Sequence, residues 1–139
     1  MPEVSQMDER VTKLLERTHT AAMVTVRPNG SAHVARVTVG LVDGKLWSTG
    51  TRNRVRTKHL RANPRATFFV FDAKSRHWLG LEGRVTIHEG PDAPQKCLAF
   101  RRAIGQEPED VDAFLREMVE VERVVYELSV ERTYGAVAE

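Results

Sequence analysis

Hydrophobic and polar residues alternate over most of the chain, and this period of two predicts β-strands. Turn residues separate the alternating segments, and Pro28-Asn29-Gly30 and Asp43-Gly44 predict tight turns between antiparallel neighbours. The six predicted strands cover residues 22–27, 32–41, 45–49, 66–71, 77–88 and 121–133. Because most of them follow one another as meanders in a chain of 139 residues, they favour a closed or nearly closed antiparallel barrel.

Apolar residues at helical spacing predict four short helices beside the strands. These helices cover residues 7–17, about 53–62, 93–104 and 108–119. Thr51 or Asn53 is expected to cap the second helix, Pro64 to follow its end, and Gly105 to join the last two. The predicted fold class is therefore mainly β (α+β), with flanking short helices.

The fourth and fifth strands carry two further signals. Residues 66–71 (ATFFVF) are apolar at both parities, which predicts burial on both faces. One face would fill the barrel, so the other must meet a helix or another subunit, and a homodimer is the economical explanation. Gly80 and Gly83 predict a bulge or sharp bend in the fifth strand.

Composition is that of an ordinary globular chain, with 41% apolar and 29% charged residues, and the length favours a single domain over residues 1–139. No apolar run approaches the roughly 18 residues that span a bilayer. Residues 1–10 contain acids and lack the apolar core of a secretory signal, so we expect a cytoplasmic protein without membrane association. Cys97 is the single cysteine, which excludes an intramolecular disulfide and a cysteine-based metal site.

The positive charge is concentrated in one segment. The net charge of the chain is only +2, yet residues 48–65 contain six basic residues and no acid. The six are Arg52, Arg54, Arg56, Lys58, Arg61 and Arg65. This segment opens a predicted helix, whose free N–H groups already attract anions, so the added arginines indicate a phosphate site. Arg52 and Arg56 are expected to bind the anion, whereas Arg54, Lys58 and Arg61 repeat at the spacing of a solvated helical stripe.

Other functional classes lack their motifs. The histidines have no metal-ligand spacing, so no metal site is expected. No GxSxG, GxGxxG or Walker sequence occurs, which excludes the common hydrolase, Rossmann and P-loop sites. The basic segment has no interleaved aromatic residues on which bases could stack, and the rest of the chain is net negative. Nucleic-acid binding is therefore not expected.

Ser48-Thr49, the run RTKHLRANPR at residues 56–65 and the apolar strand after it resemble the signature of the pyridoxamine 5'-phosphate oxidase-like split β-barrel family. Residues 78–85 (WLGLEGRV) and 123–135 are similar to the actinobacterial branch of this family that uses the deazaflavin coenzyme F420. The resemblance implies a six-stranded antiparallel split β-barrel. It also implies that a strand-end threonine and a basic residue on the following helix bind the cofactor phosphate.

Carried over residue by residue, the resemblance implies a set of cofactor-binding residues. Arg56 stands where the family commonly has lysine, and arginine keeps the charge while allowing bidentate phosphate contact. His59 stands where the deazaflavin branch often has asparagine, and Val55 where the flavin branch usually has a basic residue. Arg36 resembles a position near the cofactor, and Trp78 can border the cofactor pocket. The full set is Arg36, Ser48, Thr49, Arg52, Arg54, Arg56, Lys58 and Trp78.

The resemblance implies an oxidoreductase that uses coenzyme F420 for hydride transfer to or from a small organic substrate, with FMN as the alternative cofactor. The several separated anionic groups of F420 suit a spread of arginines better than the single phosphate of FMN does. A cofactor-binding protein without turnover is a second hypothesis. Because the cofactor carries the chemistry, no catalytic residue is assigned.

Overall fold

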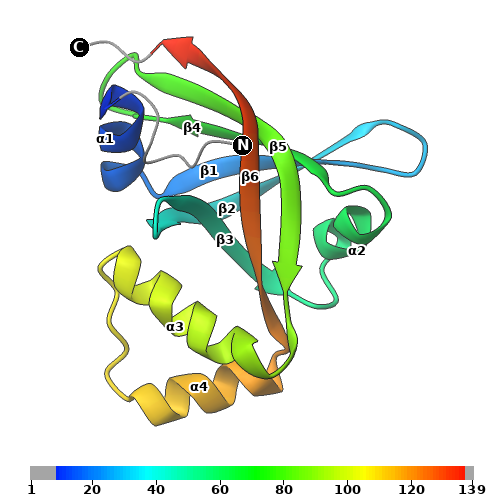
Figure 1. Ribbon diagram of the computed structural model, residues 1–139, viewed down its shortest axis with the longest axis vertical. Coiled ribbons are helices and arrows are strands. Elements are labelled where there is room, and N and C mark those ends of the chain that lie inside the picture. The colour runs from blue at the N-terminus through cyan, green and yellow to red at the C-terminus, as the bar shows by residue number, and fades with distance from the viewer. Residues whose placement is uncertain (1–8, 137–139) are drawn as a thin grey trace.

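The structure is a computed structural model that describes residues 9–136. Over these residues, six antiparallel strands form a closed barrel in the order β1-β2-β3-β6-β5-β4, with helices packed around it (Figure 1). The elements are α1 (Glu9–Arg17), β1 (Thr20–Val26), β2 (Ala32–Val42), β3 (Lys45–Thr51), α2 (Val55–Ala62), β4 (Arg65–Phe71), β5 (Trp78–His88), the 3-10 turn η2 (Gly90–Asp92), α3 (Ala93–Ala103), α4 (Val111–Glu120) and β6 (Arg123–Ala136). The mainly β (α+β) class and the six-stranded barrel expected from the sequence are confirmed.

The barrel closes because its last strand pairs on both sides. β1, β2 and β3 form a meander, whose turns place Gly30 and Gly44 at φ of 88° and 77°, a region that favours glycine. β6 then pairs with β3 along one edge and with β5 along the other. The register of β5 against β6 shifts between Glu82 and Gly83, where a side chain on Gly83 would overlap the Ser129 carbonyl. The bulge predicted in this strand is confirmed.

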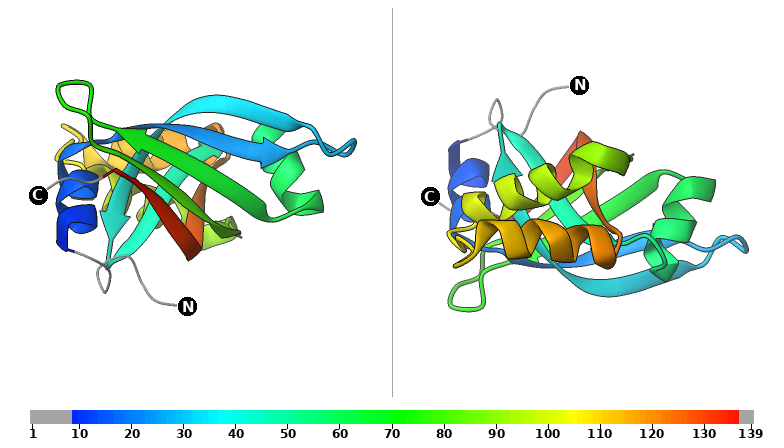
Figure 2. Two further views of the ribbon diagram at one scale, coloured as in Figure 1. Left: turned by 90° about the horizontal axis from the view of Figure 1, so that it is seen from above. Right: turned by 90° about the horizontal axis from the view of Figure 1, so that it is seen from below.

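Two helices lie at opposite ends of the barrel (Figures 1 and 2). Leu14 and Leu15 of α1 are fully buried against the barrel core, and Leu60 of α2 belongs to the same apolar cluster. The interior between them is filled by large side chains that include Tyr126 and Phe68. Burial of these apolar groups therefore anchors α2 over the barrel, although α2 itself is short and polar.

The other two helices form a layer outside the barrel. α3 and α4 lie side by side across the outer face of β2, β3 and β6, as the view from below in Figure 2 shows. A second apolar cluster joins Trp47 and Val125 of the sheet to Phe100, Phe114 and Met118 of the helices. Among the residues that the structure describes, no helix is long and apolar enough to span a bilayer.

The predicted cap of α2 is wrong. Neither Thr51 nor Asn53 caps this helix; Arg54 occupies the N-cap position, and its side chain makes no capping hydrogen bond. The reason is that β3 continues through Thr51, and the helix starts only after the turn that follows. The free N–H groups in the first turn of α2 therefore have no side-chain acceptor at the N-cap.

Other boundaries move by a few residues. α4 begins at Val111 and not at residue 108, because Asp110 is its N-cap and accepts a hydrogen bond from the Ala113 amide. β6 begins at Arg123, because Glu122 before it adopts a φ of 52°, and runs to Ala136, beyond the predicted end at residue 133. Residues 7 and 8 of the predicted first helix lie outside the described residues.

The outer face of β4 is not covered within one chain, so of the two covers expected from the sequence, a helix or another subunit, a helix does not provide it. Ala66, Phe68 and Val70 face the barrel core, but Phe69 and Phe71 on the other face are 38% and 44% exposed. The helices that could have covered this face pack elsewhere on the barrel. The ring of Phe69 contacts those of Phe71 and Trp78, with centroids 5.4 and 5.8 Å apart. The ring of Trp78 in turn contacts that of Tyr134, at 6.1 Å. These four residues form what we call the outer aromatic patch.

The contact of Gly50 with Tyr126 gives a stability prediction. A Cβ on Gly50 would overlap the Tyr126 hydroxyl, which is fixed inside the barrel, so Gly50→Ala is expected to lower the free energy of unfolding by about 1–3 kcal/mol. Chemical denaturation measures the change. Combined with Tyr126→Phe, which removes the overlapping oxygen, the same substitution should cost about 1 kcal/mol less. Strict additivity of the two substitutions would show that they do not meet.

Candidate functional site

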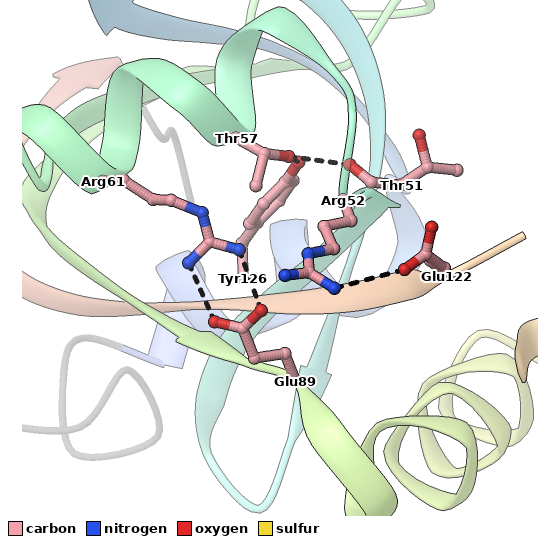
Figure 3. A network of polar contacts seen from close by, with 7 residues as sticks. All are labelled: Thr51, Arg52, Thr57, Arg61, Glu89, Glu122 and Tyr126. Carbon is pink, nitrogen blue, oxygen red and sulfur yellow. Dashed lines mark hydrogen bonds and ion pairs between the residues drawn. The ribbon is translucent and has the colours of Figure 1, made fainter.

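The junction of β3 and α2 is held by a buried hydroxyl pair (Figure 3). The Thr57 hydroxyl donates to the Thr51 carbonyl at 2.9 Å and also hydrogen-bonds the Tyr126 hydroxyl. Thr57 and Tyr126 are both fully buried, so water does not compete for these bonds. The pair ties the first turn of α2 to the end of β3 and to β6 inside the barrel.

Arg56 is the basic residue that this junction positions most closely. Its Nη2 donates to the Thr49 carbonyl at 3.2 Å, and its guanidinium lies 5.8 Å from the centre of the Tyr126 ring. Its Nε is buried and has no hydrogen-bond partner among the described residues. Burial lowers the pKa of the Arg56 guanidinium, because the charged form loses water. Arg56 is thus a partly desolvated cation with an unused donor, which favours an anionic ligand.

A second polar group lies next to α2 and was not predicted. Thr25 of β1 and His33 of β2 lie opposite one another. Each shares a strand face with residues that are buried in the barrel interior, such as Met23 and Val37. The Thr25 hydroxyl is 3.0 Å from Nδ1 of His59 on α2, and the rings of His33 and His59 meet edge to face at 5.2 Å. Nδ1 of His33 is buried and has no hydrogen-bond partner within residues 9–136. Burial, and after it the charges of His59, Arg27 and Arg56, lowers the pKa of His33. The signal in the sequence was that Thr25 and His33 are polar residues at strand positions that, by alternation, face the barrel interior.

The remaining basic residues divide into paired and unpaired ones. Arg61 forms a two-bond ion pair with Glu89, both bonds 2.8 Å long, and this pairing raises the pKa of Arg61 (Figure 3). Arg52 lies 3.2 Å from a carboxylate oxygen of Glu122. Arg54 and Lys58 are exposed, and among residues 9–136 neither they nor Arg56 has an ion-pair partner. Within the basic segment 48–65, the positive charge without an ion-pair partner is therefore that of Arg54, Arg56 and Lys58.

The two predicted residues at the end of β3 have different environments. Ser48 is fully buried and donates its hydroxyl to the Thr38 carbonyl at 2.7 Å, so this side chain already serves the β2–β3 pair. Thr49 is half-buried on the outer face of β3, and its carbonyl holds Arg56. The structure thus brings Thr49 and Arg56 together directly.

Arg36 and Trp78 lie on another face of the barrel. Arg36 is exposed on β2 and pairs with Ala22, which in turn pairs with Phe69 of β4. Trp78 begins β5, half-buried beside Phe69 in the outer aromatic patch. These two predicted site residues belong to the uncovered sheet face and do not join Arg56 within one chain. No group of metal-ligating residues occurs in the part of the chain that the structure describes.

Comparison with known proteins identifies the family of the chain. The family described as "Pyridoxamine 5'-phosphate oxidase" matches residues 7–135. An F420 reductase of known structure is 22% identical over 88% of this chain and 94% of its own, with a TM-score of 0.69. A conserved hypothetical protein from Mycobacterium tuberculosis is 18% identical over 97% of this chain and 87% of its own, with a TM-score of 0.80. A heme binding protein from Mycobacterium smegmatis is 19% identical over 99% of this chain and 55% of its own, with a TM-score of 0.73.

No curated protein matches the chain. At identities of 18% to 22%, the structural likeness shows the fold alone. The family assignment rests on the match over residues 7–135, and it confirms the resemblance seen in the sequence.

The environment of Cys97 leads to a reactivity prediction. Cys97 belongs to α3 and is buried in the apolar cluster between this helix and the sheet, and burial raises the pKa of its thiol to about 11. Since the thiolate is the reactive form, the native protein should react with a disulfide reagent such as dithionitrobenzoate only very slowly at pH 8, and at the rate of a free thiol in guanidinium. Rapid titration of one thiol in the folded protein would contradict the burial of Cys97.

Proposed function

The chain belongs to the pyridoxamine 5'-phosphate oxidase family, and we propose that it is an oxidoreductase that binds coenzyme F420 and uses it for hydride transfer to or from a small organic substrate. FMN is the alternative cofactor. When bound, the deazaflavin ring supplies the hydride donor or acceptor, and the protein supplies binding, orientation and exclusion of water.

The environment of Arg56 is the observation that carries the proposal. A phosphate beside this guanidinium would use the Nε donor that has no partner among the described residues, and it would offset the cost of burying the charge. The residue lies in the first turn of α2, where unbonded N–H groups favour an anion. The residues present therefore fit the phosphate of a flavin-type cofactor.

The distribution of charge around Arg56 supports F420 over FMN. Arg54 and Lys58 add two exposed cations on the same helix without ion-pair partners among residues 9–136. F420 carries a phosphodiester and glutamates along an extended tail, so separated cations suit it better than they suit one compact phosphate. The likeness in fold to an F420 reductase is in keeping with this choice.

We assign the other predicted residues smaller parts in the site. Thr49 holds Arg56 through its carbonyl, and Arg52 adds an exposed cation that Glu122 partly neutralises. Ser48 is committed to the β2–β3 pair, so its contribution is to the strand and not to the cofactor directly. No side chain is assigned as a proton donor.

We also propose that the protein is a homodimer that buries the outer aromatic patch. Phe69, Phe71 and Tyr134 are 38% to 44% exposed, a high value for aromatic residues that contact one another in one cluster. Arg36 and Trp78 lie on this same sheet face, so a second copy would bring them into a site between the subunits.

Titration of the purified protein with each cofactor tests the proposed function. F420 is expected to bind with a dissociation constant in the micromolar range, about −8 kcal/mol, and more weakly at high salt. FMN should bind at least about tenfold more weakly. Bleaching of F420 absorbance with a panel of oxidisable substrates, or its return from reduced F420 with a panel of reducible substrates, would separate an enzyme from a binding protein without turnover. Stoichiometric FMN after purification, with no F420 binding on exchange, would overturn the choice of cofactor.

Arg56→Ala and Arg61→Ala form a matched pair for the same titration. Arg56→Ala should weaken F420 binding by about 1.5–3 kcal/mol, roughly 10- to 150-fold, because a charge-assisted contact is lost. Arg61→Ala should change binding little, since the Arg61 guanidinium is already paired with Glu89. Equal losses would indicate a diffuse basic surface and not a specific phosphate site.

Light scattering at micromolar concentration tests the dimer. The wild-type protein should have twice the chain mass, and Phe69→Glu should shift it to the monomer with an unchanged circular dichroism spectrum, because a charge would enter the interface. Val119→Glu is the control, since Val119 is 63% exposed on α4, away from the patch. A wild-type monomer would contradict the proposed interface.

A further inference from the structure

A cavity of about 240 Å³ lies between the α3–α4 layer and the outer face of the sheet. Its walls come from α3, α4, the loop between them and the outward side chains of β2, β3 and β6. We propose that this cavity binds a small carboxylic acid with an apolar body. It does not rest on the proposed function, because the charges that carry it, Arg101 and Arg123, belong to α3 and β6 and have no assigned part in the cofactor site.

Arg123 supplies the first part of an anion site. This residue begins β6 and lines the cavity, and its Nε is buried without a hydrogen-bond partner. No hydrogen bond or ion pair joins the Arg123 side chain to any other described residue. The cation is close enough to Cys97 and Arg56 to act on the pKa of both, after the larger effect of their burial. A cation held in a wall without a counterion is costly unless an anion joins it.

Arg101 supplies a second cation that is already held in place. Its Nε donates to the Gln106 carbonyl at 3.2 Å, and its guanidinium lies 5.2 Å from the centre of the Phe114 ring. These contacts leave the terminal nitrogens of Arg101 for a ligand, since neither of them hydrogen-bonds another described residue. Glu117 is the acid in the wall and is exposed. Two arginines against one exposed carboxylate favour a ligand with one negative charge.

The rest of the wall suits an apolar body. Phe100, Ile104, Phe114 and Met118 line the cavity, and the Cys97 thiol beside them is neutral at physiological pH because its pKa is about 11. Thr38 and Thr49 add hydroxyls from the sheet. The volume of 240 Å³ is below the roughly 300–1,000 Å³ of pockets for drug-sized ligands. A carboxylate on a single ring or a short branched chain fits this size and lining better than a bare inorganic anion.

Benzoate is a suitable probe, with benzyl alcohol as the neutral analogue and inorganic phosphate as the anion without an apolar body. In two-dimensional amide NMR of the full chain, benzoate should bind saturably at about 1 mM or below. The largest shifts should fall on α3, α4 and the end of β3. Benzyl alcohol and phosphate should each bind at least about tenfold more weakly, because each lacks one half of the recognition.

Variants separate this site from general anion binding. Arg123→Met and Arg101→Met should each weaken benzoate binding at least about tenfold, whereas Arg116→Met, an exposed arginine of α4 outside the cavity wall, should leave it unchanged. The benzoate titration contains no cofactor, and its decisive variants lie on α3 and β6, so failure of the cofactor proposal and failure of this one are distinguishable.

Three outcomes would overturn the proposal. One is equal binding of benzoate and benzyl alcohol, which would indicate a purely apolar void. Another is equal weakening by Arg116→Met, which would indicate a surface effect. The third is the absence of saturable shifts in the wild-type protein. If circular dichroism shows that Arg123→Met does not fold, the effect of Arg101→Met on benzoate binding tests the proposal alone, since Arg101 lies in the last turn of α3 and is only half-buried.

Discussion

The buried hydroxyl pair of Thr57 and Tyr126 determines where the positive charge of this protein lies. Tyr126 fills the barrel, and its hydroxyl reaches the first turn of a helix that has little apolar surface of its own. The Thr57 hydroxyl in turn donates a hydrogen bond to the Thr51 carbonyl at the end of β3. Gly50 lacks a side chain where the phenol passes, so the strand, the helix and the ring can meet. Without this link, only Leu60 would anchor α2 by apolar burial.

This arrangement sets local stability against function. Arginines in the first turn of a helix oppose the helix dipole, and α2 has neither an acid in that turn nor a side-chain cap to compensate. Arg56 is partly relieved by the Thr49 carbonyl and the Tyr126 ring, but its Nε keeps no partner among the described residues. A helix start that is unfavourable alone becomes favourable with an anion beside it, which is the physical reason to look for a ligand there.

The sequence predicts the elements of this fold better than it predicts their contacts. Alternation and turn residues identify five of the six strands, and a continuous apolar run identifies β4, because those signals are local. The pairing of Arg61 with Glu89, the cluster of Thr25, His33 and His59, and the position of Arg123 all join segments far apart in the chain, so a single sequence carries no direct record of them. For a related reason, the sequence leaves open whether a helix or another subunit covers the outer face of segment 66–71. Its pattern shows only that both faces avoid water.

The outer face of the barrel is covered by helices on one side and uncovered on the other. The α3–α4 layer covers β2, β3 and β6 and leaves a cavity that contains Arg123, whereas the outer face of β4 and the start of β5 carry uncovered aromatic rings. The single outer layer, α3–α4, covers only one part of the outside of the barrel, so the apolar surface on the remaining part is available to the proposed second copy. Because Arg36 lies on the uncovered side, the surface proposed for self-association would also carry a cation toward the second copy. Association and ligand binding would therefore depend on the same sheet face.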